Sequence, residues 1–280
     1  LPTGATIAFV RDSARAAWGM EVQGGATPRL VQATPARVEV FQSEADICAL
    51  AVGYSSVEKM DVGVEASAVL RHSDAAEFRV RDQWRIERDI ASVRRTIDIT
   101  GRAPGGFDSF IGFAVEPSVA WRDVACFAPG ALYGDPTFDG ERSPGGTRNY
   151  ADRLLVMRED LLPAPLFALS FPNRTSVAIL DPAPRGDSTI DETKLQEAVM
   201  VDARFQFGAL GAWQDEGGPV EFGFRFPGTS RLFTGGALAQ TPPRWFRRYH
   251  PIEPGVPHRY EVSFRFGANE SFPQVTRNAW

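Results

Sequence analysis

Residues 220–226 read VEFGFRF, with an apolar side chain at every even position and a polar residue or glycine between. Residues 201–207 (VDARFQF) and 260–266 (YEVSFRF) follow the same two-residue period. Successive side chains of a strand point to opposite faces, so each segment has one apolar and one polar face. This alternation is typical of antiparallel sheets, because the strands of parallel sheets are usually apolar on both faces. We therefore predict antiparallel strands with buried aromatic side chains.

The strand pattern extends over most of the chain. Residues 201–213 and 220–226 are joined by QDEGG (214–218), whose glycines are typical of a hairpin. Further candidate strands are residues 37–41, 47–54, 62–70, 77–90, 93–99, 107–116, 154–157, 166–171 and 177–181. We predict an all-β fold, a large antiparallel β-sandwich of two packed sheets with few short helices. Less than about a tenth of the residues should be helical.

Helical signals are confined to three segments. Residues 12–20 and 191–199 are each long enough for one or two turns and begin with acidic or hydroxyl side chains. Near the C-terminus, Ser271 resembles a helix cap, Pro273 suits a first turn, and residues 274–280 begin a helical pattern. We predict a β-domain over residues 1–270. Residues 271–280 are then the start of a helix or linker leading to a catalytic domain outside this chain, or alternatively a short terminal helix or frayed tail.

The composition excludes several classes of protein. The chain has 280 residues, 43% of them hydrophobic and 23% charged, and a net charge of −5. These values exclude a disordered chain, a collagen and a coiled coil. The sequence has no apolar run of the roughly 18 residues that a membrane helix needs. The acidic balance argues against nucleic acid, because phosphate binding relies on clustered cations. We expect neither a membrane nor nucleic acid as a partner.

The residues that carry common chemistries form no known motif. Cys48 and Cys126 have no metal-ligand spacing, and we expect them to remain unbridged, with Cys48 buried in an apolar run. The histidines, His72, His250 and His258, do not stand beside the G-x-S-x-G turn of a serine hydrolase, which the sequence lacks. Glycine motifs for phosphates or dinucleotides are also absent from the sequence. We therefore predict no cofactor, no metal and no nucleophilic triad.

Five short segments together resemble one known type of domain. They are residues 127–136 (FAPGALYGDP), 157–167 (MREDLLPAPLF), 180–184 (LDPAP), 226–229 (FPGT) and 276–280 (TRNAW). Through them the chain is similar, over nearly its whole length, to the β-supersandwich that precedes the (α/α)6 barrel of six-hairpin glycosidases. Glucoamylase-like and maltose-phosphorylase-like enzymes are of this kind. Their catalytic carboxylates lie on the barrel.

The resemblance implies the accessory β-domain of a glycoside hydrolase, which supports the barrel and lends loop residues to the substrate cleft. Its partners would be a carbohydrate and a C-terminal (α/α)6 domain, with no catalytic residue in this chain. It also implies a bacterial source, in a cytoplasmic or secreted protein. Two alternatives stay open, a free-standing carbohydrate-binding module and a complete small glycosidase. The latter needs two carboxylates about 5–10 Å apart, and the turn acids that could converge are Asp135, Asp181, Asp187 and Glu192.

The expected substrate-binding residues belong to two segments. The loop at residues 128–149 is long and rich in Gly and Pro, and loops on rigid sheets gather binding residues. We expect this loop and residues 158–160 at the sandwich edge that faces a catalytic domain. A stacking surface, acceptors and a bidentate donor are what sugar faces and hydroxyls require. The residues that supply them are Tyr133, Asp135, Arg158 and Glu159.

The same residues also permit a purely structural interpretation, in which Arg158 pairs with Glu159 or Asp160 and fixes the loop to the sheet. Other aromatics beside polar turns fit a sugar platform as well, namely Tyr150 and Trp213. Residues 244–249 (RWFRRY) form a basic and aromatic cluster. We interpret that cluster as a strand whose Arg side chains lie over core aromatics, in preference to a nucleic-acid site.

Overall fold

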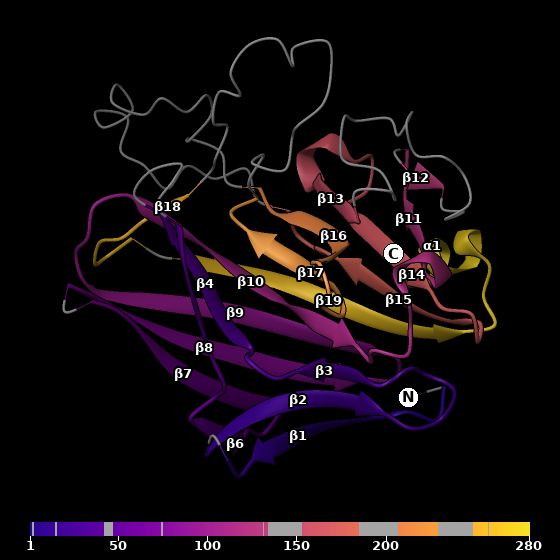
Figure 1. Cartoon of the computed structure of the whole chain (residues 1–280), viewed down its shortest axis with the longest axis horizontal. Coiled ribbons are helices and arrows are strands. Elements are labelled where there is room, and N and C mark those ends of the chain that lie inside the picture. The colour runs from indigo at the N-terminus through magenta and orange to yellow at the C-terminus, as the bar shows by residue number, and fades with distance from the viewer. Residues whose placement is uncertain are drawn as a thin grey trace.

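The computed structural model contains two antiparallel sheets packed face to face (Figure 1). It describes residues 1, 3–14, 16–41, 47–73, 75–130, 132–133, 153–184, 207–228, 249–256 and 258–280, and of 132–133 the strand alone. The prediction of an all-β, two-sheet antiparallel sandwich is confirmed. The expected helix at residues 191–199, the strand start at 201–206, most of the loop at 128–149 and residues 244–248 lie outside the described residues.

The first sheet has ten strands. Seven follow one another across it in the order β1 (Thr6–Asp12), β2 (Ala17–Gln23), β3 (Leu30–Gln32), β10 (Gly106–Val115), β17 (Val220–Phe226), β16 (Ala209–Gln214) and β13 (Leu154–Arg158). Three more complete it: β4 (Ala36–Phe41) and β18 (His250–Pro251) pair with β10, and β5 (Ile47–Val52) pairs with β4. We call this the ten-stranded sheet.

The second sheet has nine strands. They lie in the order β12 (Leu132–Tyr133), β11 (Ala125–Ala128), β14 (Leu166–Ser170), β15 (Thr175–Leu180), β19 (His258–Ala268), β9 (Ile90–Gly101), β8 (Ala76–Glu87), β7 (Val64–His72) and β6 (Ser56–Lys59). β2 contacts β6, and β16 contacts β14 and β15. The two sheets are therefore stacked with β12 and β13 at one end and β1 and β6 at the other.

The alternating segments bury their aromatic faces as predicted. Phe222 and Phe224 of β17 are fully buried, and so are Phe264 and Phe266 of β19. These side chains meet in one hydrophobic core between the sheets. Arg225 departs from the pattern, since it occupies a polar position of β17 and is still only 9% exposed. Part of the outer face of the ten-stranded sheet, around Arg225, is therefore buried and not exposed to solvent.

Two local predictions are wrong. Residues 12–20 do not form a helix, because they complete the hairpin of β1 and β2, in which Asp12 pairs with Ala17. The turn between them contains Ala16 at a φ of 51°, outside the right-handed helical region. Cys48 is exposed, because it lies on β5, which pairs with β4 alone among the described strands. Cys48 and Cys126 are both free, as predicted.

The C-terminal helix is confirmed as α1 (Phe272–Ala279). Ser271 and Gln274 form a reciprocal capping box, and Pro273 lies in the first turn. Val275 and Ala279 pack into a small hydrophobic cluster with residues of β11, β14 and β15. Two short 3-10 helices, η1 (Trp121–Asp123) and η3 (Glu159–Leu161), follow or precede strands. Among the described residues, no helix is both long and apolar enough to span a membrane.

A buried arginine connects the two sheets. Arg95 of β9 is fully buried and donates to both oxygens of Asp82 on β8, at 2.7 and 2.6 Å. It also donates to the carbonyl oxygens of Phe110 and Pro35 in the ten-stranded sheet, each at 2.7 Å. Burial alone would lower the pKa of Arg95, but the charge of Asp82 raises it well above its usual value. The guanidinium therefore stays charged and is held by both sheets.

Candidate functional site

Three glycines lie side by side in the middle of the ten-stranded sheet, and the ring of Phe110 lies close over two of them, Gly112 and Gly223. Gly112 of β10 pairs with Gly223 of β17, which pairs in turn with Gly211 of β16. A Cβ on Gly223 would lie 2.3 Å from the carbonyl oxygen of Ile111, too close for any side chain. Glycine inside a strand marks a close approach of another backbone or of a ligand. Three adjacent strands thus lack side chains at the same level of the sheet.

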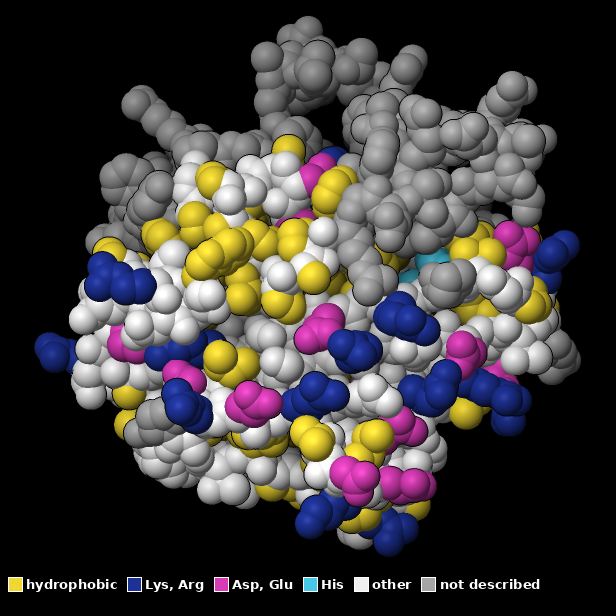
Figure 2. All heavy atoms as spheres, turned by 180° about the vertical axis from the view of Figure 1, so that it is seen from behind, with side chains coloured by type: hydrophobic (Ala, Val, Ile, Leu, Met, Phe, Trp, Pro, Cys, Tyr) yellow, Lys and Arg dark blue, Asp and Glu magenta, His cyan; other side chains and the backbone are white. Residues whose placement is uncertain are grey.

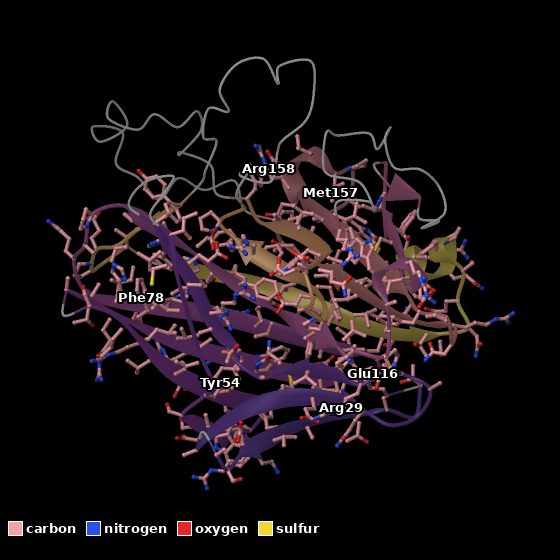
Figure 3. The ribbon with its side chains drawn as sticks, viewed as in Figure 1. Arg29, Tyr54, Phe78, Glu116, Met157 and Arg158 are labelled. Atoms are coloured by element: carbon pink, nitrogen blue, oxygen red, sulfur yellow. The ribbon has the colours of Figure 1, made fainter. Side chains whose placement is uncertain are left out.

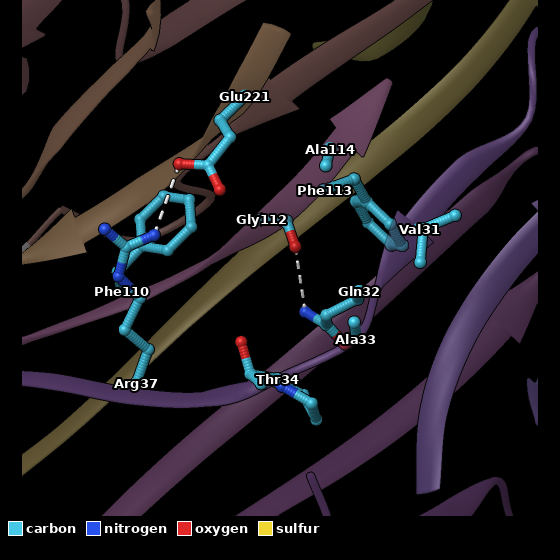
Figure 4. Close-up of a pocket in the computed structure, with 11 residues that line it drawn as sticks. Val31, Gln32, Ala33, Thr34, Arg37, Phe110, Gly112, Phe113, Ala114 and Glu221 are labelled. Carbon is cyan, nitrogen blue, oxygen red and sulfur yellow. Dashed lines mark hydrogen bonds and ion pairs between the residues drawn. The ribbon is translucent and has the colours of Figure 1, made fainter. Parts of the chain in front are cut away.

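An acidic and an aromatic side chain lie next to these glycines. Trp213 of β16 and Glu221 of β17 are cross-strand partners, and the indole N–H donates to Oε2 of Glu221 at 2.9 Å. Arg37 of β4 donates to the same oxygen at 3.2 Å (Figure 4). No described residue donates to the other oxygen of Glu221, whose side chain is 27% exposed. The carboxylate is therefore held in place with one oxygen left to accept a hydrogen bond.

Phe110 fills the space between these groups. Its ring lies against that of Trp213, edge to face, with centroids 4.9 Å apart. The guanidinium of Arg37 lies over the same ring, 5.3 Å from its centroid. A cation over an aromatic face is attracted by the ring quadrupole. Arg37 is thus fixed by a ring as well as by the Glu221 carboxylate.

Arg37, Phe110 and Glu221 border a pocket of about 110 Å³, and Trp213 lies against two of these residues, Phe110 and Glu221. It is lined by Val31, Gln32, Ala33, Thr34, Pro35, Arg37, Phe110, Gly112, Phe113, Ala114 and Glu221 (Figure 4). Gln32 is 5% exposed, and its amide nitrogen donates to the carbonyl oxygen of Gly112 at 3.1 Å. Its Oε1 has no hydrogen-bond partner. A buried acceptor without a partner is satisfied by water or by a ligand hydroxyl.

A buried ionic cluster lies next to the pocket on the same face. Arg225 donates to Asp108 of β10 at 2.7 Å and to Glu39 of β4 at 3.2 Å. Burial alone would lower the pKa of Arg225, but the two carboxylates raise it above its usual value. These charges are therefore occupied with one another, and the cluster ties β4, β10 and β17 together beneath the site.

Arg158, an expected sugar-binding residue, lies at the end of β13 (Figure 3). It pairs with Ala209 of β16, which pairs with Arg225 of β17, so all three share the outer face. Arg158 donates two hydrogen bonds to the Asp160 carboxylate, one from Nε at 2.9 Å and one from Nη2. This contact is the one that the structural interpretation requires. The Arg158 side chain as a whole is 23% exposed.

Glu159 points the opposite way and lies in the interior. It is 3% exposed, and its Oε1 accepts a hydrogen bond from the backbone N–H of Gly208. Burial, followed by the charge of Asp181 and a hydrogen bond with it, raises the pKa of Glu159 to about 9. Asp181 follows β15 of the other sheet, so the structure brings together two acids that the sequence could only name separately. The sequence analysis expected Glu159 to bind substrate at the surface, but the structure places its carboxyl group in the interior.

The other expected site residues are less fully described. Tyr133 lies on β12, paired with Phe127 of β11, and its side chain is outside the described residues, as is the whole of Asp135. β12 and β13 are the outermost strands of their sheets at the same end of the sandwich (Figure 1). Tyr133 and Arg158 therefore come from one end of the molecule.

Sequence reasoning singled out Trp213 but missed Arg37, Phe110, Glu221 and Gln32. Glu221 was assigned to the polar side of an alternating strand and was not distinguished from a solvated residue. The available signal was glycine in the middle of strands, at Gly112 and Gly223, where it weakens pairing unless a close approach requires it. Among the described residues, no group of three or more His, Cys, Asp or Glu side chains could hold a metal ion.

Comparisons with known proteins give a remote structural similarity. No family model matches the sequence, and no curated protein matches it. Fifteen chains of solved structures match. The Slr1438 protein from Synechocystis sp. PCC 6803 is 13% identical, with 94% of this chain and 96% of that one covered and a TM-score of 0.44.

Two other matches have sugar-related descriptions. A galactose mutarotase related enzyme from Lactobacillus acidophilus is 11% identical, with 95% and 99% covered and a TM-score of 0.41. A GalM/aldose epimerase homologue from C. elegans is 11% identical, with 96% and 97% covered and a TM-score of 0.42. At such values no residue role passes from these proteins to this chain.

Proposed function

We propose that this chain is the β-sandwich part of a carbohydrate-active enzyme and binds a saccharide on the outer face of its ten-stranded sheet. The observation that carries the proposal is the Trp213 indole bonded to Glu221, a residue that lines the pocket together with Gly112. Sugars present apolar ring faces edged by hydroxyls. An aromatic ring, a fixed carboxylate and an unpartnered amide oxygen match those two features.

The proposed role is binding without catalysis. Glycoside hydrolysis needs two carboxylates that face one bond. Of the acids beside the pocket in the described part of the chain, Glu39 and Asp108 are bound by Arg225, and only Glu221 keeps a partly exposed carboxylate. A single carboxylate held by Arg37 and Trp213 suits the recognition of hydroxyl groups. We expect the isolated chain to hydrolyse no glycoside.

The family resemblance adds a finer proposal, in which the chain supports the (α/α)6 barrel of a glycoside hydrolase. Tyr133, Asp135 and Arg158 would then reach the cleft of the barrel from the end where β12 and β13 lie. This part is tested by Asp135→Ala in the full enzyme. Lost activity at an unchanged melting temperature supports it, and unchanged activity per folded molecule contradicts it. A free-standing binding module is the alternative, and it predicts the same saccharide binding without a barrel.

The binding proposal is tested by affinity electrophoresis of the chain in gels containing starch, mixed-linkage β-glucan, xylan or galactomannan. We expect at least one gel to retard the chain, and Trp213→Ala to weaken that retention at least tenfold. Trp280→Ala is the matched control, because Trp280 is 75% exposed at the end of α1, and the buried residues of α1 pack against β11, β14 and β15 of the nine-stranded sheet. Retention by none of the four gels, or equal effects of the two substitutions, would overturn the proposal.

A further inference from the structure

A second pocket adjoins the first on the same face of the ten-stranded sheet. It has a volume of about 270 Å³ and is lined by Val10, Asp12, Gly19, Met20, Glu21, Val31, Gln32 and Ala33. Val31, Gln32 and Ala33 line both pockets. The two hollows are therefore neighbours that meet at the end of β3, and together they extend from β1 and β2 to β17.

From this continuity we propose that the saccharide site is one end of a groove that binds several consecutive units of a neutral polysaccharide chain. The inference rests on the proposed function, because it extends the site of Trp213 and Glu221. The groove runs across the strands, in the order β1, β2, β3, β10 and β17. Adjacent strands lie about 4.8 Å apart, so four spacings give a length of about 19 Å. A single sugar ring fills only part of that length.

The junction of the two pockets contains an unsatisfied polar group. Gln32 is 5% exposed, lines both pockets, and has no partner for its Oε1. That oxygen is buried in the wall of the junction, on the same side of the sheet as Met20, where an ordered water can supply the missing hydrogen bond. The backbone is also close there, because a Cβ on Gly19 would lie 2.6 Å from the carbonyl oxygen of Gln32. The middle of the groove thus has the features of a binding surface as well as its ends.

The charges along the groove favour a neutral ligand over a polyanion. Its charged lining residues are Asp12, Glu21, Arg37 and Glu221. Arg37, the cation among them, is bound to Glu221 at 3.2 Å. Glu21 is bound by Arg29 at 2.7 Å. The described lining therefore offers no guanidinium that is not already bound to a carboxylate and could attract a uronate, while its carboxylate oxygens can accept hydrogen bonds from hydroxyls.

The test measures affinity against chain length. The probes are size-fractionated oligomers of one to six units from whichever neutral polysaccharide retains the chain, with polygalacturonate as the anionic comparison. We expect affinity in calorimetry to rise at least tenfold from one or two units to five or six, and polygalacturonate to bind more weakly. An affinity that does not change beyond two units, or tighter binding of polygalacturonate, would overturn the groove.

A blocking variant tests the junction itself. Ala33 is exposed and lines both pockets, so Ala33→Arg adds bulk there without entering the core. This variant should abolish the rise in affinity with oligomer length and leave the affinity for one or two units unchanged. Val69→Arg is the control, since Val69 is 43% exposed on β7 of the other sheet. If Ala33→Arg behaves like Val69→Arg, the groove is wrong while the Trp213 site can stand. If no neutral polysaccharide is retained, both proposals fail.

Discussion

The outer faces of the two sheets both carry ion pairs, but the side chains of these pairs differ in how far they are exposed. On the nine-stranded sheet, Arg81 pairs with Asp98, and Arg94 with Glu261, through side chains that are 37–56% exposed. In the lower half of Figure 2 basic and acidic side chains are interspersed, and hydrophobic side chains gather above them. On the ten-stranded sheet, the side chain of Arg225 is 11% exposed and those of its partners 7% and 0%. These two pairs of the nine-stranded sheet thus lie in water, whereas the Arg225 cluster of the ten-stranded sheet is buried.

This difference shows which face is specialised. Exposed ion pairs contribute little to stability but keep a sheet soluble. Buried charges are costly to desolvate, so they are weak evidence for stability and stronger evidence for a defined arrangement. β7 and β8 contain no glycine, while β10, β16 and β17 each have one at the same level. The ten-stranded face therefore combines the features of a site, and the nine-stranded face those of a solvated surface.

The largest expected effect compares one arginine from each face. Arg225→Ala removes the buried guanidinium that binds Asp108 and Glu39, and we expect a loss of about 3–5 kcal/mol in the free energy of unfolding. Arg81→Ala breaks an exposed pair and should cost at most about 1 kcal/mol. Urea denaturation of both variants measures the difference. Similar losses would mean that the two faces do not differ as described.

A smaller loss of stability is expected when a glycine in the middle of β17 is replaced. Gly223→Ala places a Cβ 2.3 Å from the carbonyl oxygen of Ile111, so the strands must shift, at a cost of about 1–3 kcal/mol. Gly218→Ala is the control, because its nearest neighbour would lie at an ordinary 3.4 Å. Thermal melts compare them, and saccharide binding should fall in Gly223→Ala alone. Equal melting temperatures would show that the strands around Gly223 can accommodate a Cβ without strain.

Two single acids, one in each sheet region, are expected to affect how stability depends on pH. The pKa of Glu159 is about 9 in the fold and near 4.5 in the unfolded chain. The folded state therefore keeps a proton that the unfolded state loses, so stability falls as pH rises from about 4.5 to 9. The slope is at most about 1.4 kcal/mol per pH unit. Glu159→Gln should flatten it, as measured by melting temperatures across that range. An unchanged slope would show that Glu159 is ionised in the fold.

Glu77 on the nine-stranded sheet gives the opposite sign. Hydrogen bonds from Arg79 and Arg71 lower the pKa of this exposed carboxyl. Its contribution is present above pH 4.5 and is lost as pH falls through the lowered value. Glu77→Gln should thus change stability slightly above pH 4.5 and leave the slope between pH 5 and 9 intact. A flattened slope in this variant would contradict the assignment to Glu159.

The sequence predicted the fold better than the site because the fold depends on local periodicity. The two-residue alternation of β17 and β19 is enough to bury Phe224 and Phe264 on one side. The hairpin at residues 12–20 was missed because a short acidic turn followed by apolar residues also matches a helix start. Its pairing between β1 and β2 becomes visible only when both strands are placed.

The site depends on pairings that no local pattern contains. Arg225 reaches Asp108 and Glu39 across 117 and 186 residues of chain, so its burial could not be read from its own strand. Glu159 was expected to accept hydrogen bonds at the surface, yet its meeting with Asp181 places it inside. Trp213 was recognised from its neighbours in sequence, but its partner Glu221 required the register of β16 and β17.

Arg95 couples the two sheets when the protein unfolds. Its guanidinium is satisfied only by Asp82 on one side together with the carbonyl oxygens of Phe110 and Pro35 on the other. If one sheet separated, a buried charge would lose part of its acceptors, which is strongly unfavourable. Partly melted forms with one intact sheet should therefore be scarce, and unfolding should be cooperative. The groove on the ten-stranded sheet would then be present in full or lost together with the whole sandwich.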